Sequence, residues 1–136
     1  MDYLSGKQVS SVFSEKKARN NKELHKQNAT FSSFCNEVIK MLNPDEKAVL
    51  NEKFLTPEIV SVMKDQELIE CINAFFKNNL NISETSRNAF LHRNTLLYRI
   101  EKIYKLTGFN IRNFEDAMTF RLLTIIYEKI NKGLDK

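Results

Sequence analysis

The sequence has few of the residues that interrupt regular structure or build covalent and metal-bound scaffolds. Its 136 residues include only three glycines and two prolines, too few for a loop-rich or all-β chain. The two cysteines, Cys35 and Cys71, lie far apart and form no C-x-x-C pair, which argues against a disulfide framework and a zinc site. Each falls among apolar neighbours at helical spacing, so we expect two buried free thiols, in keeping with a reducing cytosol.

Long apolar runs and catalytic patterns are also missing. No stretch approaches the ~20 apolar residues of a membrane span, and the N-terminus lacks the apolar segment of a secretory signal. There is no glycine-rich phosphate loop, and no serine or cysteine has a recognisable base partner. His25 and His92 are too isolated to indicate a metal site. We therefore expect a soluble, cytoplasmic protein that is not an enzyme and has no cofactor, metal or membrane partner.

The residues that are abundant favour helices packed on one another. Hydrophobic residues make up 42% of the chain, and the net charge of +4 permits a polyanionic partner without requiring one. Residues 1–30 are polar and are predicted to be flexible. From there an apolar stripe recurs at helical spacing over 31–42, formed by Phe31, Phe34, Cys35, Val38, Ile39 and Leu42. The sequence thus predicts an all-α helical bundle.

Capping signals divide the rest of the chain into helices. Asn43 and Pro44 start a helix that ends near Thr56-Pro57, and a short segment around 59–63 follows. Further starts are predicted at Asp65 for a helix to about Asn79, at Ser83 for a short helix to about Phe90, and at Asn113, with Asp116 completing a capping box. The last helix has a wide apolar surface, so we expect it to pack on two sides and to end at Gly133. The predicted organisation is a flexible segment 1–30, a helical regulatory or dimerisation segment 31–64, and a DNA-binding domain 65–132.

The short helix and the helix that follows meet at residues 90–92. Two helices joined by so few residues must cross steeply, which is the helix-turn-helix arrangement. The second helix, about 93–106, is predicted to turn Leu96, Ile100 and Ile103 inward, and Asn94, Tyr98, Glu101 and Lys105 outward.

The outward side chains suit contacts to DNA. Asparagine can bond adenine, threonine can touch a thymine methyl group, and arginine and lysine suit phosphate oxygens. The candidate base contacts are Arg93, Asn94, Thr95 and Tyr98. The candidate backbone contacts are Ser83, Thr85, Arg87, His92, Arg99, Lys102 and Lys105. His92 at the turn has a second interpretation, as a cap of the second helix. Arg99 on the flank of that helix also has one, as a bond to a neighbouring helix or to an acid such as Glu84.

The charge of this segment agrees with that interpretation. Residues 84–105 hold five Arg or Lys against two Glu, a local excess of +3. The hypothesis is a sequence-specific binder of double-stranded DNA that acts as a homodimer, with the second helix in the major groove. The alternative is a helical interaction or dimerisation module whose basic face is incidental.

Several of these residues resemble a known family. The run His92-Arg93-Asn94-Thr95-Leu96, then Tyr98-Arg99 and Thr107-Gly108, is similar to the signature of PucR/CdaR-type bacterial regulators, which include the sugar-diacid regulators. The resemblance covers about residues 65–128 and implies a C-terminal helix-turn-helix that regulates transcription. It also implies an upstream effector-sensing domain in full-length members, so we expect this chain to be a fragment or a shortened regulator. Neither the effector nor the operator follows from these residues. Ala89 departs from the family, which usually has a larger apolar residue there, and is expected to loosen the packing of the two helices.

Overall fold

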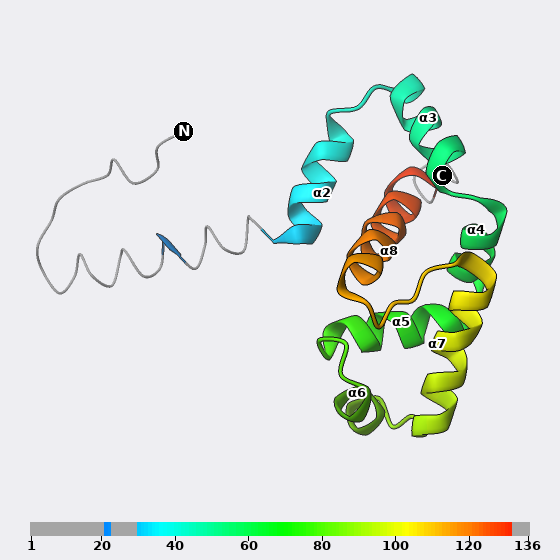
Figure 1. Ribbon diagram of the computed structural model, residues 1–136. Helices are drawn as coiled ribbons and strands as arrows, with labels where there is room; N and C mark the ends of the chain where they lie inside the picture. The colour runs from blue at the N-terminus through cyan, green and yellow to red at the C-terminus, as the bar shows by residue number, and fades with distance from the viewer. Residues whose placement is uncertain (1–20, 23–29, 132–136) are drawn as a thin grey trace, which may run out of the picture.

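The described part of the protein is a bundle of helices. The computed structural model describes residues 21–22 and 30–131, and the second range holds seven α-helices, a closing π-helical turn and no strand (Figure 1). The elements are α2 (Phe31–Lys40), α3 (Pro44–Phe54), α4 (Pro57–Lys64), α5 (Gln66–Lys77), α6 (Ile82–Asn88), α7 (Arg93–Thr107), α8 (Phe114–Ile126) and η1 (Tyr127–Asn131). The predicted all-α bundle is confirmed. The predicted flexible segment 1–30 and the predicted end at Gly133 lie, apart from residues 21–22 and 30, outside the described residues.

Local polar side chains fix where several helices begin, as the sequence predicted. Asn43 accepts a hydrogen bond from the Glu46 N–H at 2.8 Å, and the Glu46 carboxylate accepts one from the Asn43 N–H at 2.9 Å. Asn43 and Glu46 thus form a full capping box. Pro44, between them, has a ring that suits the first helical position. The Asp65 side chain caps α5 by accepting a hydrogen bond from the Leu68 N–H at 3.2 Å. No helix of the described residues is long and apolar enough to cross a membrane.

The start of α8 follows the predicted capping box only in part. The Asn113 side chain accepts hydrogen bonds from the N–H groups of Glu115 and Asp116, which caps the helix. The Asp116 carboxylate does not return a bond to Asn113; it accepts one from the Asn110 N–H at 3.0 Å. Asp116 therefore also holds the loop that precedes α8.

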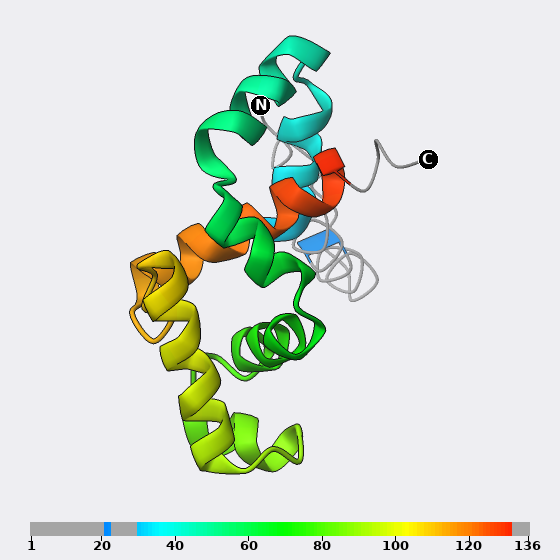
Figure 2. The same cartoon turned by 90° about the vertical axis from the view of Figure 1, so that its right-hand side faces the viewer.

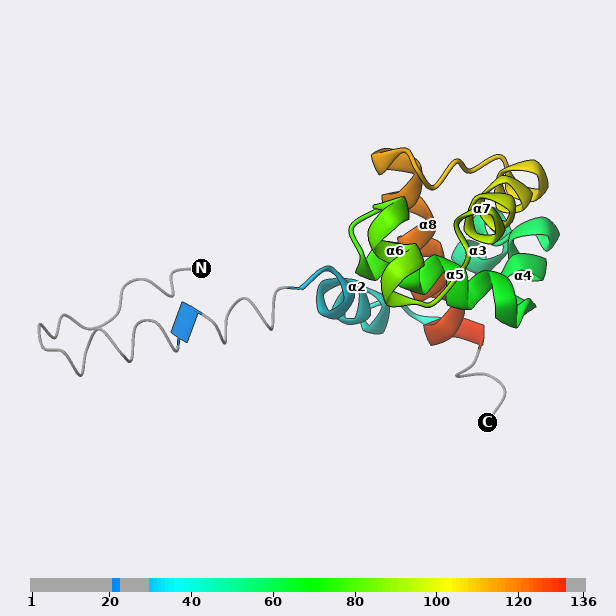
Figure 3. The same cartoon turned by 90° about the horizontal axis from the view of Figure 1, so that it is seen from below.

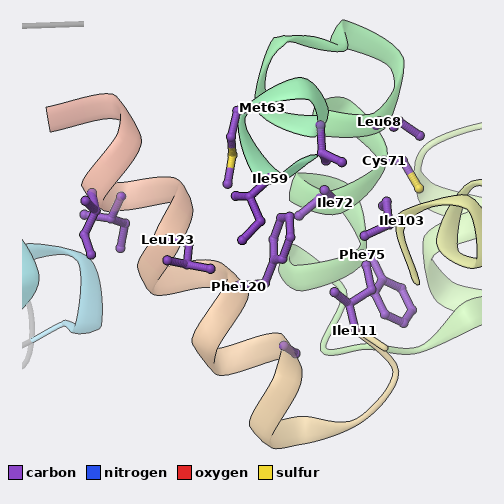
Figure 4. Close-up of a cluster of buried hydrophobic side chains, with 14 of the residues drawn as sticks. Ile59, Met63, Leu68, Cys71, Ile72, Phe75, Ile103, Ile111, Phe120 and Leu123 are labelled. Carbon is purple, nitrogen blue, oxygen red and sulfur yellow. The ribbon is translucent and has the colours of Figure 1, made fainter. Parts of the chain in front are cut away.

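The core lies where α4, α5, α7 and α8 meet. Ile72 and Phe75 of α5, Ile103 of α7 and Phe120 of α8 are completely buried, and Figure 4 shows Phe120 pointing from α8 towards Ile72. Each large apolar side chain that is fully buried contributes about 1.5–3 kcal/mol. The buried residues of α2 and α4 belong to the same core cluster, so helices on both sides of the predicted boundary at residue 65 share one core.

The apolar stripe predicted over 31–42 is only partly buried. Cys35 and Ile39 pack against α8, whereas Phe34 is 62% exposed and Met41 80% exposed. The stripe therefore divides into a side that packs against α8 and a side that remains exposed. Figure 3 shows α2 and α7 at opposite sides of the bundle.

The last helix does pack on two sides. Phe120 and Leu123 enter the core, and the side of α8 near Arg121 faces α2, where the guanidinium partly opposes the rise that burial causes in the pKa of Cys35. A further stripe of α8 stays exposed and consists of Phe114, Met118 and Leu122. The α-helix passes into the π-helical turn η1 at Tyr127.

Candidate nucleic-acid interface

The helix-turn-helix consists of α6 and α7, and the side chain directly before α6 caps its first turn. Asn81, not Ser83, caps it: the Asn81 side chain accepts a hydrogen bond from the Glu84 N–H at 2.8 Å. The predicted cap at Ser83 is wrong because Asn81 already has the extended backbone that a cap requires, so the helix begins at Ile82. Ser83 consequently lies in the first turn with an exposed side chain.

Thr85 was predicted to contact the DNA backbone, and the structure contradicts this. The residue is 0% exposed, and its hydroxyl donates to the Asn81 carbonyl at 2.7 Å. It lies on the buried side of α6 with Ile82, which is 8% exposed. Thr85 is therefore a packing residue, and a seven-residue helix can present only its opposite side to a ligand.

The turn between the helices is rigidly closed. The Leu91 N–H donates to the Ser86 carbonyl at 3.0 Å, and the Ser86 hydroxyl donates to the Leu91 carbonyl. Phe90 between them has a φ of 52°, the left-handed conformation that commonly ends a helix. Ala89 is exposed at this helix end, so the expectation that it loosens the packing of α6 on α7 is wrong. Figure 2 shows α6 beside the N-terminal half of α7.

The orientation predicted for α7 is confirmed. Leu96 and Ile103 are completely buried and Ile100 is 3% exposed, whereas Asn94 is exposed and Tyr98 is 66% exposed. Glu101, Lys102 and Lys105 are exposed on the same outer half of the helix, and Thr95 is half-buried at its side. The helix extends one residue further than predicted, to Thr107, and ends at Gly108 with a φ of 84°.

The first turn of α7 is organised by its own side chains. The His92 Nδ1 atom accepts a hydrogen bond from the Asn94 N–H at 3.1 Å, so the cap predicted as one of its two roles is confirmed. The Arg93 Nη1 atom donates to the Ser83 hydroxyl at 3.3 Å, which joins the starts of α6 and α7. Both side chains remain exposed, so they can also reach a ligand.

Arg99 is directed away from the outer face. Its guanidinium lies 3.1 Å from the Glu67 carboxylate on α5, and its side chain is only 22% exposed. The same guanidinium lies near Cys71, where burial raises the pKa of the thiol to about 11 and the positive charge partly opposes that rise. The structure thus engages Arg99 between α7 and α5, which agrees with the second interpretation, a bond to a neighbouring helix, and not with a DNA backbone contact. Arg87 is exposed and forms a 3.5 Å ion pair with Glu84 within α6.

The structure adds a basic residue that the sequence did not reveal. An open hollow of about 630 Å³ runs along the outer face of α7, with Asn94, Tyr98 and Glu101 on one side and Asn110 and Arg112 on the other. The loop that carries the last two residues is held against the bundle by Ile111, which is completely buried. The alternation of polar, apolar and polar residues at 110–112 was the only signal in the sequence. This pattern indicates that Arg112 lies beside α7 only when the position of α8 is known.

Two comparisons with known proteins agree with this geometry. The family of the PucR C-terminal helix-turn-helix domain matches residues 68–126. The purine catabolism regulatory protein of Bacillus subtilis is 28% identical over 86 residues, which are 63% of this chain and 16% of that protein. The carbohydrate diacid regulator of Escherichia coli is 44% identical over 45 residues, 33% of this chain and 12% of that protein. No solved structure matches the chain.

The chain spans less than one fifth of the length of either relative. The names of both describe regulators, in agreement with the expectation that this chain is not an enzyme. The matched segment contains α6 and α7 in full. Residues 68–126, which include this helix-turn-helix, are therefore similar to the PucR C-terminal helix-turn-helix domain.

Proposed function

We propose that this protein binds double-stranded DNA sequence-specifically and regulates transcription, with α7 in the major groove. The observation that carries the proposal is the outward position of Asn94 and Tyr98 on a helix whose other side is completely buried. A rigid helix with hydrogen-bonding groups on its free side suits the major groove, which is wide enough to admit one α-helix. The names of the two relatives, both regulators, support the same function.

The base contacts come from the first two turns of α7. Asn94 can bond an adenine with its amide, and Arg93 can bond a guanine with its guanidinium. Tyr98, one turn further on, offers a hydroxyl to a base edge or a phosphate. Thr95 is half-buried, which leaves it a contact at the side of the helix, such as a thymine methyl group.

The backbone contacts come from the exposed polar and basic side chains around this helix. Ser83, Arg87 and His92 lie on the α6 side, and Lys102 and Lys105 lie further along α7. Arg112 adds a positive charge across the hollow. Glu101, between them, is unfavourable near phosphates unless it accepts a hydrogen bond from a cytosine or pairs with a neighbouring lysine.

Selection of bound duplexes from a random pool, followed by a salt titration on the selected site, tests this proposal. The logarithm of the binding constant should fall by ~0.9 for each phosphate contact per logarithmic unit of salt. Asn94→Ala should weaken binding to the selected site by roughly 1–3 kcal/mol and relax the preference at one base pair. Lys105→Ala, the matched control on the same outer face, should weaken all duplexes about equally. Absence of any enriched sequence, or of any salt-dependent binding, would refute the proposal and favour the interaction module.

We further propose that the protein binds DNA as a homodimer through α2 and α8. Their exposed apolar side chains are Phe31, Phe34 and Val38 on α2, Met41 directly after it, and Met118 and Leu122 on α8. Patches of this kind mark interaction surfaces, and one recognition helix reads too few base pairs for a specific site. Figure 3 shows α2 on the opposite side of the bundle from α7, so a second copy can bind at α2 without covering the DNA-binding face.

The dimer is tested by analytical ultracentrifugation at increasing protein concentration. Phe34→Glu should shift the protein to a monomer and weaken binding to a two-half-site duplex more than to a single half-site. Leu106→Glu, an exposed leucine on α7 that is 41% exposed, is the control and should leave the association state unchanged. A wild-type protein that remains monomeric at high concentration, with and without DNA, would contradict the proposal.

Access to chromosomal DNA also requires the cytoplasmic location expected from the sequence.

A further inference from the structure

Phe90 is the most exposed large apolar side chain in the described residues. It is 95% exposed, more than Met41 at 80% or Phe114 at 69%. It lies in the turn between α6 and α7, immediately before the residues assigned above to DNA. An aromatic ring in this position gains almost nothing from packing within the protein.

The backbone of Phe90 makes its identity more unusual. Its φ of 52° is the left-handed conformation, which costs about 1–2 kcal/mol for residues other than glycine and asparagine. At the corresponding helix ends the chain has Asn79 and Leu80 after α5, with φ of 57° and 61°, and Gly108 after α7, with a φ of 84°. Leu80 packs against the core, whereas the ring of Phe90 does not. Phenylalanine therefore stands at a position where smaller residues cost less, and its exposed ring gives no compensation inside the protein.

The surroundings of Phe90 favour a nucleic acid over a protein partner. Within four residues on either side lie Arg87, His92, Arg93 and Asn94, all exposed. No acidic residue occurs between positions 85 and 100 of the sequence. An apolar protein surface offers no negative groups to pair with these positive charges. A duplex presents phosphates beside apolar sugar faces and thymine methyl groups.

We infer that Phe90 is a further DNA-contacting residue, whose ring packs against an apolar face of one nucleotide at the edge of the site read by α7. This inference rests on the proposed function and adds to it. Helix-turn-helix proteins contact base edges with the N-terminal residues of the second helix, so the turn just before that helix reaches the rim of the major groove. Two sources offer the same apolar chemistry there, namely a thymine C5-methyl group and a deoxyribose.

The test uses the 136-residue chain, the selected duplex and Phe90→Gly. Glycine removes both the ring and the strain, so the variant should be at least as stable as the wild type while binding the duplex about tenfold more weakly. Phe54→Ala is the matched control, because Phe54 is a partly exposed phenylalanine on α3. It should leave the dissociation constant of the folded protein unchanged.

Replacing thymidine by deoxyuridine in the duplex, one position at a time, distinguishes the two sources. If one replacement weakens the wild type and not Phe90→Gly, the ring contacts that methyl group. If no replacement has this effect but Phe90→Gly still binds weakly, the ring contacts a deoxyribose. Equal affinity of wild type and Phe90→Gly overturns the inference and leaves the proposed function intact. A lower thermal midpoint for Phe90→Gly also overturns it, because the ring would then pack within the protein. Failure of the wild type to bind any duplex is a failure of the proposed function itself.

Discussion

His92 links the stability of the protein to the order of the first turn of α7. Its Nδ1 atom accepts the Asn94 N–H at 3.1 Å, and this is the side-chain cap of α7. Removing a side-chain cap costs about 1 kcal/mol, within a range of roughly 0.5–2. His92→Ala should therefore lower the free energy of unfolding by about 1 kcal/mol. That corresponds to a thermal midpoint lower by ~4–8 °C for a domain of this size.

His92→Asn is the control, because asparagine is among the best capping residues. This variant should recover the stability that His92→Ala loses, measured by urea denaturation under the same conditions. Equal stability of His92→Ala and the wild type would refute the reasoning. It would mean that packing of Leu96 and its neighbours alone determines where α7 begins.

The same pair of variants reports on DNA binding. Arg93 and Asn94 lie in the first turn of α7, and a binding-competent state that is less populated lowers the apparent affinity by its fraction. A local loss of about 1 kcal/mol thus weakens binding by up to about fivefold in His92→Ala. His92→Asn should bind as the wild type does if His92 acts only as a cap. An equally stable His92→Asn that binds more weakly identifies the imidazole as a direct phosphate contact.

Four further outcomes are expected. Gly108→Ala should destabilise the protein by about 1 kcal/mol in urea denaturation. The φ of Gly108 is 84° and an added Cβ meets no atom within 4 Å, so backbone strain is the only cost. An unchanged denaturation midpoint would contradict this prediction. Thr85→Val should leave the DNA dissociation constant of the folded protein unchanged, since the hydroxyl is buried; a salt-dependent loss of affinity would restore its predicted backbone contact. Between pH 9 and 11 the free energy of unfolding should fall by on the order of 2 kcal/mol more in the wild type than in Cys71→Ala. The reason is that the Cys71 thiol has a pKa of 9.0 when unfolded and of about 11 when folded. Parallel profiles of unfolding free energy against pH would refute the effect of burial on this pKa. Arg112→Ala should weaken binding to all duplexes and reduce the salt slope by ~0.9, and an unchanged slope would exclude a phosphate contact.

The sequence alone determined the features that depend on neighbours along the chain. The caps at Asn43, Asp65 and His92 were predictable because a cap and the N–H that it binds lie within three residues of each other. The end of α7 at Gly108 follows from one residue that adopts the left-handed conformation at little cost. The inward and outward sides of α7 followed from helical periodicity, since fifteen residues contain about four turns.

Only the tertiary structure decided which polar side chains are available to a ligand. Thr85 lies on a helix that is too short for periodicity to show its buried side. Arg99 forms an ion pair with Glu67, a residue 32 positions earlier. Arg112 lies beside the outer face of α7 because Ile111 is buried against distant helices, and Phe34 is exposed although its neighbour Cys35 packs inward. Capping and periodicity act over one or two turns of a helix, so they can be read from consecutive residues. Exposure depends on which elements pack together across the bundle, and no local pattern contains that information.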